Sequence, residues 1–521
     1  MAAHSEPPEV RSPAVRNSQA HIPAGEEHLD VLILGAGLSG IGAACHLRRA
    51  FPGRSLAILE ARESIGGTWD LFRYPGIRSD SDMFTMGYSF RPWEDARGIA
   101  DGPSILAYVR DTARAHGIEQ LIRFRHRGIR ASWCSERARW TVIAQRTDTG
   151  EEVRLTCDFL YMCTGYYRYD GGHNPAFPGS EDFSGQIVHP QQWPAELDCS
   201  GRRIVVIGSG ATAVTLVPSL VAEGAEHVTM LQRSPTYIVP IPARDRLAGV
   251  LGRWISPRRA YALVRWRNVL MMILIFQLCR RAPGLMRSRF QRMAAAELPE
   301  DFDVDTHLSP TYNPWDQRVC LAADGDFFQA LREGGASIVT ATLERFTPDG
   351  VRLADGTELA ADIVVTATGL RLMMLGGLEL DLDGEPVEVG STIAYKGMML
   401  CGIPNLAFTV GYTNASWTLK ADLVAEYVCR LLAHMRATGR PVCVPRSPRP
   451  GLPQYPILDL KSGYVLRSAD ALPKQAGTLP WRLHQNYIRD IRLLRHGPVD
   501  DEIDFALPSA SAADPVVAAA A

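Results

Sequence analysis

The stretch VLILGAGLSGIGAACHL, residues 31–47, decides the fold of this chain. Its first four residues are apolar and predict a buried parallel strand, and a G-x-G-x-x-G pattern made by Gly35, Gly37 and Gly40 follows directly. Gly35 permits a tight turn, Gly37 lets a pyrophosphate come close to the backbone, and Gly40 lets the next helix pack against the strand. Because the first N–H groups of a helix are free and its dipole is positive there, this unit predicts a dinucleotide site.

The residue that follows the second strand narrows the choice of nucleotide. That strand, 56–59, ends in Glu60, which lies twenty residues after Gly40, where a ribose hydroxyl is expected. A carboxylate there disfavours a 2′-phosphate, so FAD or NAD fits this site better than NADP. A plain glycine turn in an α/β sheet is the alternative that needs no ligand.

The opening pattern occurs a second time in the middle of the chain. The apolar strand 204–207 is followed by G-x-G-x-x-A, made by Gly208, Gly210 and Ala213. The next strand ends without an acid, and Arg233 stands twenty residues after Ala213. A guanidinium can hold a 2′-phosphate in a forked contact of roughly 1.5–3 kcal/mol, so this second site predicts NADP. An exposed arginine at a strand end is the alternative.

Two such units in 521 residues predict an α/β fold with two Rossmann-like dinucleotide-binding domains, since the chain is too long for one core. The FAD-binding domain is expected to be built from two separate segments, and the NADP-binding domain to carry a helical insertion. The expected boundaries are 28–165 and 370–505 for the FAD domain, 166–369 for the NADP domain, 240–310 for the insertion, and 1–27 and 506–521 for disordered tails.

Composition excludes several classes of protein. Apolar residues make up 46% and charged residues 21%, and the net charge of −2 gives no indication of a nucleic-acid partner. The ten cysteines are scattered without a C-x-x-C pair. This pattern indicates reduced thiols in a cytoplasmic protein and argues against a disulfide oxidoreductase.

One apolar segment, 265–281, raises the question of a membrane. Its uncharged part, Val269–Cys279, would form a helix roughly 16 Å long, whereas a bilayer core is about 30 Å thick. We therefore expect that it does not span a membrane. A buried helix is the simpler interpretation, and a helix with basic flanks lying on the inner face of the cell membrane is the alternative.

Two long motifs remain: GGTWDLFRYPGIRSD at 66–80 and FSGQIVHPQQWP at 183–194. By itself the first is a loop over a domain edge and the second a structured linker, in which a lone histidine such as His189 is more often structural than catalytic. Together they resemble the signatures of Baeyer–Villiger monooxygenases, the class B flavin monooxygenases. The stretches PTYNPWDQR (310–318) and GYTNASWTLKAD (411–422) are similar to the subgroup that activates the thioamide prodrug ethionamide.

The resemblance implies roles for individual residues, and no metal. FAD would be held by Gly35, Gly37, Ser39, Gly40 and Glu60, with Thr68, Trp69, Asp70 and Leu71 along its flavin side. Arg78, Ser79 and Asp80 would lie between the two cofactors, and Gly128 would also contact a cofactor. NADP would be held by Gly208, Ser209, Gly210, Ala211, Thr212, Ala213, Val214, Gln232 and Arg233. The domain linker would contain Phe183, Gly185, His189 and Trp193. Arg318 would be the catalytic arginine, oriented by Asp80, with an ordinary surface arginine as the alternative.

The activity that the resemblance implies is NADPH- and O₂-dependent oxygenation through a C4a-peroxyflavin. Ketones would become esters or lactones, with Arg318 stabilising the anionic peroxide and its adduct, and sulfides or thioamides could also be oxidised. The first alternative is an amine- or sulfide-oxygenating flavin monooxygenase, whose members usually lack the Trp-Pro ending of the linker motif. A plain NADPH:quinone reductase and a flavin-bound redox sensor or scaffold without turnover are two others.

Overall fold

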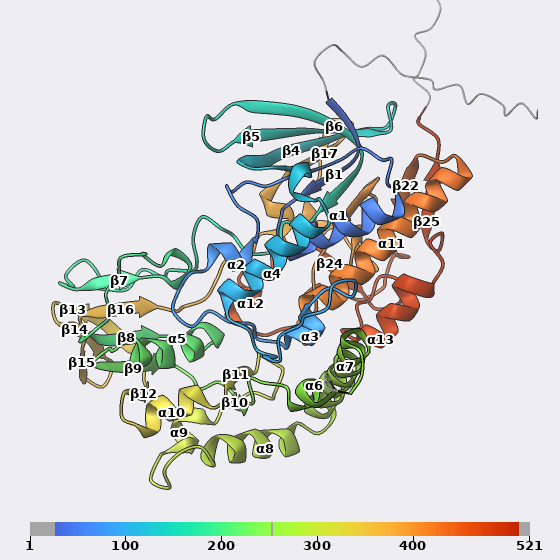
Figure 1. Ribbon diagram of the computed structural model, residues 1–521. Helices are drawn as coiled ribbons and strands as arrows, with labels where there is room; N and C mark the ends of the chain where they lie inside the picture. Colours follow the sequence, from blue (N-terminus) through green and yellow to red (C-terminus); the bar gives the residue numbers. More distant parts are fainter. Residues whose placement is uncertain (1–26, 252–253, 510–521) are drawn as a thin grey trace, which may run out of the picture.

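Two β-sheets organise the computed structural model, which describes residues 27–251 and 254–509 (Figure 1). The first sheet contains the opening strand, the second contains the repeated motif, and helices pack against both. The predicted tails lie mostly outside the described residues. At their edges the prediction is wrong, because Glu27 begins β1 (Glu27–Leu34) and Ala506 ends β25 (Ile503–Ala506).

The first sheet has the order β18-β17-β4-β5-β6-β1-β2-β3, with β21 also paired to β6. Strand β1 lies parallel between β2 and β6, as the dinucleotide-binding pattern requires. Strands β17 and β21 come from the C-terminal third of the chain and pair with β4 and β6, so the chain returns to this sheet. The strand bounds are β2 Leu56–Leu59, β3 Ile122–Arg123, β4 His126–Cys134, β5 Arg139–Arg146, β6 Glu152–Met162, β17 Glu379–Leu382, β18 Glu385–Pro386 and β21 Leu406–Phe408.

The second sheet is entirely parallel, with the order β12-β9-β8-β16-β7. Alternate residues of β8 are buried on opposite faces of the sheet. Val206 packs towards α5 and α10, and Val205 packs towards the small antiparallel sheet β13-β14-β15. The bounds are β7 Gln186–Val188, β8 Arg203–Ile207, β9 His227–Gln232, β12 Ala336–Thr340, β16 Ile363–Thr366, β13 Leu343–Thr347, β14 Gly350–Leu353, β15 Glu358–Ala360, α5 Ala211–Ala222 and α10 Asp326–Arg332.

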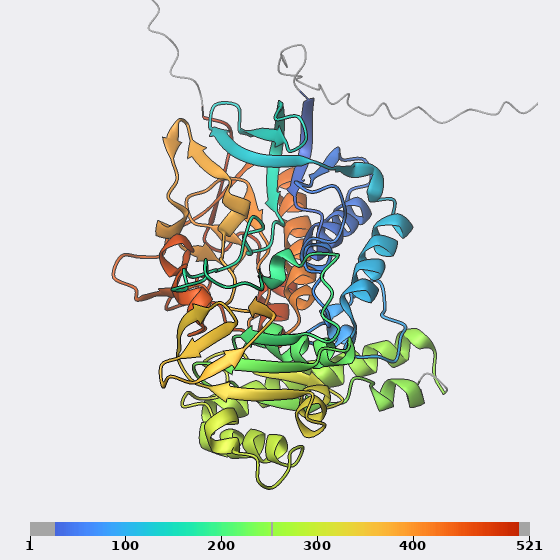
Figure 2. The ribbon, with the colours of Figure 1, turned by 90° about the vertical axis from the view of Figure 1, so that its left-hand side faces the viewer.

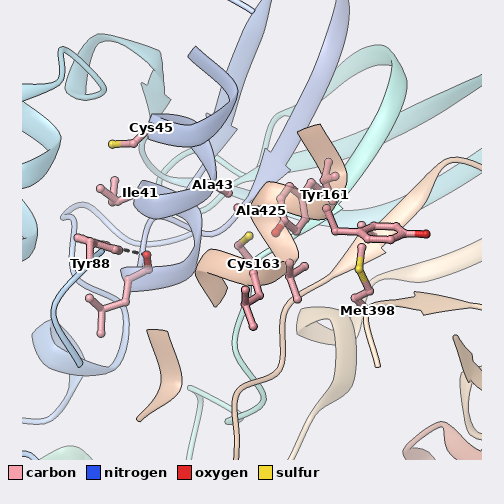
Figure 3. Packing of buried hydrophobic residues seen from close by; sticks show 14 of the residues in the cluster. Ile41, Ala43, Cys45, Tyr88, Tyr161, Cys163, Met398 and Ala425 are labelled. Atoms are coloured by element: carbon pink, nitrogen blue, oxygen red, sulfur yellow. Dashed lines mark hydrogen bonds between the residues drawn. The ribbon is translucent and has the colours of Figure 1, made fainter. Parts of the chain in front are cut away.

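The largest core lies between α1 (Leu38–Ala50) and α11 (Trp417–Thr438), which cover one face of the first sheet (Figure 3). Gly42 allows this packing, because a Cβ there would lie 2.9 Å from the ring of Tyr88. The Tyr88 hydroxyl donates a hydrogen bond to the Leu38 carbonyl at 2.7 Å. Tight packing around the first turn of α1 therefore fixes the end of α1 that follows the glycine loop.

Helices replace the α/β alternation between β10 (Ile238–Ile241) and β11 (Cys320–Ala323), as the sequence predicted for the insertion. They are α6 Arg246–Leu251, α7 Pro257–Arg281, α8 Pro283–Ala295 and α9 Val304–Leu308. The expected length of the apolar helix is wrong, because α7 has 25 residues and is about 37 Å long. By length and composition α7 could cross a membrane. Only 22% of its most apolar 18-residue stretch is buried inside the protein, so the interpretation as a buried helix is also wrong.

Shorter elements complete the chain. They are α2 Thr68–Leu71, α3 Met83–Met86, α4 Gly102–Ala115, α12 Gly463–Leu466, α13 Tyr487–Asp490, β19 Ala394–Tyr395, β20 Met399–Leu400, β22 Val442–Pro445, β23 Gln454–Pro456 and β24 Lys474–Ala476.

Candidate active site

A cavity of about 920 Å³ lies where the two glycine loops face each other, between the first and second sheets. This is the usual place for a ligand site in an open α/β protein, at the carboxyl ends of the strands. Sixteen of the residues predicted from the sequence line it: Gly35, Gly37, Ser39, Glu60, Thr68, Trp69, Arg78, Asp80, Gly128, Gly208, Ser209, Gly210, Ala211, Thr212, Arg233 and Arg318.

The first glycine loop is shaped by the protein's own packing. Gly35 has φ +103°, and a Cβ there would lie 2.5 Å from the carbonyl oxygen of Cys163. A Cβ at Gly40 would lie 1.8 Å from the carbonyl oxygen of Gly35, so the helix touches the loop directly. No side chain caps the N-terminus of α1, which begins after Gly37, and its first N–H groups are therefore available to a ligand in the cavity.

Glu60 closes this loop from the end of β2. Its carboxylate accepts hydrogen bonds from the backbone N–H of Ala36 at 2.8 Å and of Arg62 at 3.0 Å. Burial raises the pKa of Glu60, although the two backbone hydrogen bonds oppose the shift. The side chain is 5% exposed and lines the cavity, so a hydroxyl arriving there would meet a fixed carboxylate.

The second loop is open towards the same cavity. A Cβ at Gly208 would lie 2.3 Å from the carbonyl oxygen of Ala367, whereas a Cβ at Gly210 would meet nothing within 4 Å. No side chain caps α5, which begins after Gly210. Arg233 is exposed, lines the cavity and has no hydrogen bond or ion pair with any residue in the described ranges. The loop therefore presents free N–H groups and an uncommitted guanidinium.

Arg318 and Asp80 form an ion pair in the cavity wall, Nη1 to Oδ2. The Nε of Arg318 is buried and has no hydrogen-bond partner among the described residues. The pair joins the segment after the insertion to the loop after α2. It places one guanidinium, already oriented by a carboxylate, beside the space between the two loops.

Arg78 joins the two lobes at a neighbouring point. Its guanidinium makes a forked contact with Asp326, with Nη2 to Oδ1 at 3.1 Å. Asp326 is the first residue of α10 in the second lobe. Arg78 therefore links the two lobes, and its position between two bound cofactors stays a prediction.

Seven predicted cofactor residues do not line the cavity: Gly40, Asp70, Leu71, Ser79, Ala213, Val214 and Gln232. Asp70 is buried and accepts hydrogen bonds from Ser64 and from the guanidinium of Arg62. These contacts lower the pKa of Asp70, although burial opposes them. Gln232 donates to the carbonyl of His307 at 2.7 Å and to Thr340 at 2.9 Å, which ties the insertion to β12. Asp70 and Gln232 therefore stabilise the walls of the cavity from outside its lining.

The linker motif joins the sheets and also lies outside the cavity lining. His189 accepts a hydrogen bond from the Gln191 N–H at Nδ1, and its Nε2–H donates to the carbonyl of Gly369 at 3.3 Å. Burial lowers the pKa of His189, which favours the neutral ring that this pattern needs. Phe183 packs against Phe346. Gly185 is also closely packed, because a Cβ there would lie 2.3 Å from the carbonyl oxygen of Asp362. Trp193 packs on the core of the second sheet.

Aromatic residues that the sequence did not predict form much of the cavity wall. Tyr166, Tyr167 and Tyr169 follow the strand-end glycine Gly165 and line the cavity. Trp417, at the start of α11, lies beside Tyr166 with ring centroids 5.1 Å apart. The strand-end position of the tyrosines was a usable signal, because ligands bind there. Nothing in the local sequence brings Tyr464 and Arg467, about three hundred residues later, to the same wall.

Comparisons with known proteins agree with this architecture. The profile of the flavin-binding monooxygenase-like family matches residues 29–244. The chain is 56% identical to the FAD-containing monooxygenase EthA of Mycobacterium tuberculosis over 476 residues, which cover 91% of this chain and 97% of the relative. The chain belongs to the FAD-containing monooxygenases. It is also 48% identical to the putative FAD-containing monooxygenase MymA of the same species, over 92% of this chain and 97% of that protein.

Solved structures of more distant proteins have the same fold as this monooxygenase. An oxidised steroid monooxygenase bound to NADP has a TM-score of 0.72 at 23% identity, covering 92% of this chain and all of that one. Cyclohexanone monooxygenase from Rhodococcus sp. Phi1 has a TM-score of 0.67 at 20% identity, covering 81% and 87%. The two-lobed α/β fold predicted from the glycine loops is thus confirmed.

The residues of this monooxygenase fit two dinucleotides. Gly165 and Gly210 border the cavity where an added Cβ would meet nothing within 4 Å, so the walls leave room after the end of β6 and beside the second loop. Two uncapped helix N-termini suit two pyrophosphates. The fixed carboxylate of Glu60 suits a ribose hydroxyl, and the free guanidinium of Arg233 suits a phosphate.

Proposed function

We propose that this FAD-containing monooxygenase uses NADPH and O₂ to insert one oxygen atom into ketones, giving esters or lactones. The observation that carries the proposal is the Arg318–Asp80 pair beside the space between the two glycine loops. A fixed cation is needed there because charge develops on the substrate carbonyl oxygen during oxygen insertion.

The two loops would hold the two cofactors. FAD would lie on the N-terminus of α1 with its ribose at Glu60, and NADPH on the N-terminus of α5 with its 2′-phosphate at Arg233. When bound, FAD supplies the redox chemistry, taking hydride from NADPH and activating O₂. The protein's contribution is to bind, orient and shield the reacting groups.

Arg318 would stabilise negative charge on the oxygen of the substrate carbonyl. A single well-placed donor to such an oxyanion contributes on the order of 10²–10³ in rate. Asp80 would hold the guanidinium in one orientation and offset its charge before substrate arrives. The Arg318 side chain is 30% exposed and lines the cavity, so the N–H groups that do not face Asp80 can meet the reacting group.

The aromatic wall would keep water out. Tyr166, Tyr167 and Trp417 pack against one another along the cavity, and burial raises the pKa of nearby Tyr169 to about 12. These hydroxyls therefore stay protonated at neutral pH. A dry, neutral wall strengthens the interaction between Arg318 and developing charge.

Sulfide or thioamide oxygenation is the second candidate. It is favoured by 56% identity to EthA, the relative whose subgroup the sequence motifs resemble. Transfer of oxygen to sulfur creates no carbonyl oxyanion, so it does not need Arg318 in the same way. Family membership favours both of these enzymatic activities over a flavin-bound sensor or scaffold without turnover.

Turnover under ¹⁸O₂ tests the proposal. The purified enzyme with FAD and NADPH is given a panel of cyclic and linear ketones and one thioether, and products are analysed by mass spectrometry. One ¹⁸O atom in an ester or lactone supports the proposal. Labelled sulfoxide without labelled ester would support the second candidate, and NADPH consumption without labelled product would support a reductase.

We propose further that the enzyme is cytoplasmic. All ten cysteines are free thiols, most of them buried, as expected in a reducing compartment. A peripheral contact with the inner face of the membrane through residues 265–281 is compatible with that location.

A further inference from the structure

Helix α7 carries an apolar stripe that the rest of the protein covers only in part. Leu263, Trp266, Leu270, Leu274 and Leu278 recur at intervals of three and four residues, so they lie along one face of the helix. Together with Met271 they are between 37% and 56% exposed. A stripe of this length on one helix is far more than the scattered single apolar residues found on ordinary protein surfaces.

The stripe continues onto the neighbouring segments. Val250 in α6 is 53% exposed, Trp254 after α6 is 82% exposed, and Leu285 in α8 is 61% exposed. Figure 2 shows the green helices α6 and α7 projecting from the side of the molecule, away from both sheets. We call the exposed apolar residues of 247–285 that the structure describes the α6–α8 surface. The rest of the chain covers it only in part, as where Trp266 packs beside Tyr487 with ring centroids 6.0 Å apart.

The charged side chains of residues 246–296 are all positive. Residues 246–296 contain eleven arginines and neither aspartate nor glutamate, although the whole chain has a net charge of −2. Arg258 and Arg259 precede the stripe, and Arg280, which pairs with Asp316 at 3.0 Å, and Arg281 follow it. An apolar stripe with basic ends, together with exposed tryptophan, is the composition of a helix that lies at the surface of an anionic membrane.

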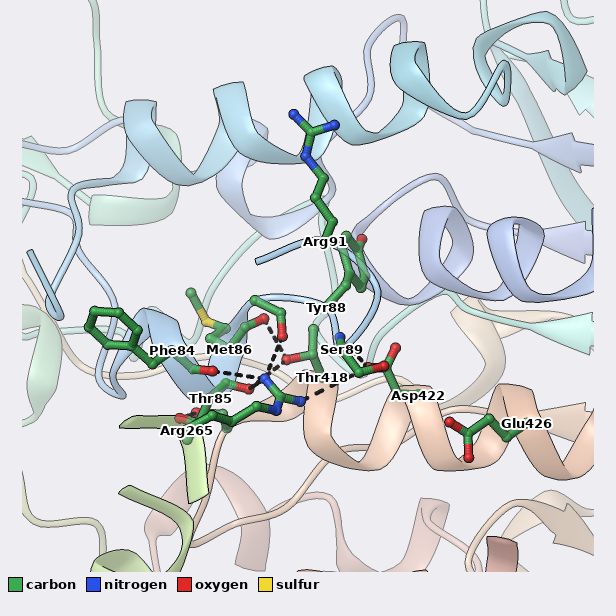
Figure 4. Close-up of polar contacts among 12 residues, drawn as sticks. Phe84, Thr85, Met86, Tyr88, Ser89, Arg91, Arg265, Thr418, Asp422 and Glu426 are labelled. Atoms are coloured by element: carbon green, nitrogen blue, oxygen red, sulfur yellow. Dashed lines mark hydrogen bonds and ion pairs between the residues drawn. The ribbon is translucent and has the colours of Figure 1, made fainter. Parts of the chain in front are cut away.

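The opposite face of α7 is fixed to the first lobe (Figure 4). Arg265 is buried and donates hydrogen bonds to the carbonyls of Phe84 at 2.8 Å, Thr85 at 3.1 Å and Gly87 at 2.8 Å. Its Nη2 lies 4.0 Å from the buried carboxylate of Asp422 on α11. Helix α7 is long enough to cross a bilayer. It is not free to do so, because the first lobe holds this face of the helix.

We infer that the α6–α8 surface docks in the plane of an anionic phospholipid leaflet, with the apolar stripe of α7 inserted among the acyl chains. Charge favours a membrane over a second copy of this chain. Asp245 pairs with Arg267 and Asp316 pairs with Arg280. Arg258 and Arg259 have no ion-pair partner among the described residues, so a two-fold dimer would place these uncompensated arginines against their own copies. Anionic headgroups neutralise the same arginines. The inference rests on the proposed cytoplasmic location and not on the identity of the substrate.

A pocket of about 390 Å³ at the edge of the stripe suits a phosphate headgroup. It is lined by Arg49, Arg258 and Arg495, and by Trp266, which also belongs to the stripe. Arg495 pairs with Glu426, whereas Arg49 and Arg258 have no ion-pair partner among the residues that the structure describes. A lipid whose acyl chains meet the stripe would therefore find two uncommitted guanidinium groups beside its headgroup.

Sedimentation with vesicles tests the inference on the FAD-loaded enzyme. Vesicles contain phosphatidylcholine alone or phosphatidylcholine with about one third phosphatidylglycerol. We expect binding to the anionic vesicles at least about tenfold tighter than to the neutral ones, falling at high salt. Inorganic phosphate at millimolar concentration should not compete, because the acyl chains contribute to docking. Failure to bind anionic vesicles, or equal binding to both compositions, would overturn the inference.

The variant L270E/L274E places two carboxylates on the stripe, and L507E places one on an equally exposed leucine elsewhere. The first should weaken vesicle binding at least about tenfold and the second should leave it unchanged, with NADPH oxidation retained in both. R49Q/R258Q should reduce the preference for anionic lipid but keep the weak neutral binding. Equal vesicle binding by L270E/L274E and the native protein would contradict the docking surface. Retained turnover in that case would leave the proposed function standing.

Self-association is the competing outcome. Light scattering after size exclusion reports the oligomeric state of the native protein and of L270E/L274E. A native dimer that this variant dissociates, with no vesicle binding by either protein, would overturn the inference in favour of an interface between two copies.

Discussion

Arg318 and Asp80 lie 238 residues apart in the chain and form an ion pair in the wall of the cavity. Strands β3 to β10 and the insertion separate them in sequence, yet the guanidinium reaches the loop after α2. The family resemblance implies a catalytic role for these two residues alone, and the ion pair places them side by side. The first prediction follows from this contact.

R318A is expected to lower ester formation by about 10²–10³-fold while NADPH oxidation continues, with hydrogen peroxide released instead. Removing the cation removes stabilisation of the carbonyl oxyanion without altering either glycine loop. Ester yield and peroxide are measured in the same reaction. R352A, which breaks a surface pair with Glu358, is the matched control. Undiminished ester formation by R318A would remove this residue from the mechanism.

R233Q should reduce the preference for NADPH over NADH by about tenfold to a hundredfold. The expected loss corresponds to one forked phosphate contact of roughly 1.5–3 kcal/mol. Steady-state kcat/KM with each nicotinamide measures it. R202Q serves as the control, because Arg202 is exposed just before β8, at the opposite end of that strand from the glycine loop. An unchanged ratio in R233Q would place the 2′-phosphate elsewhere.

E60Q should lose FAD during purification and dilution. A glutamine cannot accept from both the Ala36 and Arg62 N–H groups, so the loop loosens and the ribose loses its carboxylate. The ratio of flavin absorbance to protein absorbance gives the occupancy. E63Q, on an exposed side chain paired with Arg125, should retain the native ratio. Full occupancy in E60Q would contradict the proposed ribose contact.

D422N is expected to destabilise the protein by about 3 kcal/mol, because Arg265 and His46 lose the carboxylate that they share. Contacts with His46 and Arg265 lower the pKa of Asp422, against the opposing effect of burial. The stabilisation is therefore present above the carboxyl's ordinary pKa and lost as pH falls through the folded value. Thermal unfolding of D422N and of the exposed-site control D111N, followed across pH, should show the deficit of D422N narrowing in acid.

H189Q should flatten the acid side of the stability profile. Burial lowers the pKa of His189, so its stabilising contribution is complete above the ordinary value of 6.5 and is lost as pH falls through the lower folded value. The melting temperature is compared between pH 7 and 5, with H496Q, an exposed histidine, as control. Parallel profiles for the native protein and H189Q would show that this linker histidine does not couple protonation to folding.

The two glycine loops were predictable because each is a local pattern. Strand, turn, helix N-terminus and the residue after the next strand occur within about thirty residues, and short-range geometry brings them together. Glu60 and Arg233 line the cavity for that reason. The domain boundaries and the contacts of individual residues with cofactors stay predictions.

The length of α7 was not predictable from the charge pattern. Arg265 and Arg267 resemble the polar start of a short helix, so the sequence predicts an apolar helix that begins at Val269. In the folded protein Arg265 is buried against the carbonyls of Phe84 and Gly87, which lie far away in sequence. Helix α7 therefore extends back to Pro257, and its other face becomes the exposed stripe.

The sequence by itself determined the α/β class, the two nucleotide loops and their different ribose-end residues, because these depend on glycine positions and on one side chain at a strand end. Only the tertiary structure decided which residues close the cavity and which face of α7 is left partly exposed. The same cavity is lined by Tyr166, Trp417 and Arg467 because sheets and helices pack around a shared core. That packing depends on contacts between residues hundreds of positions apart.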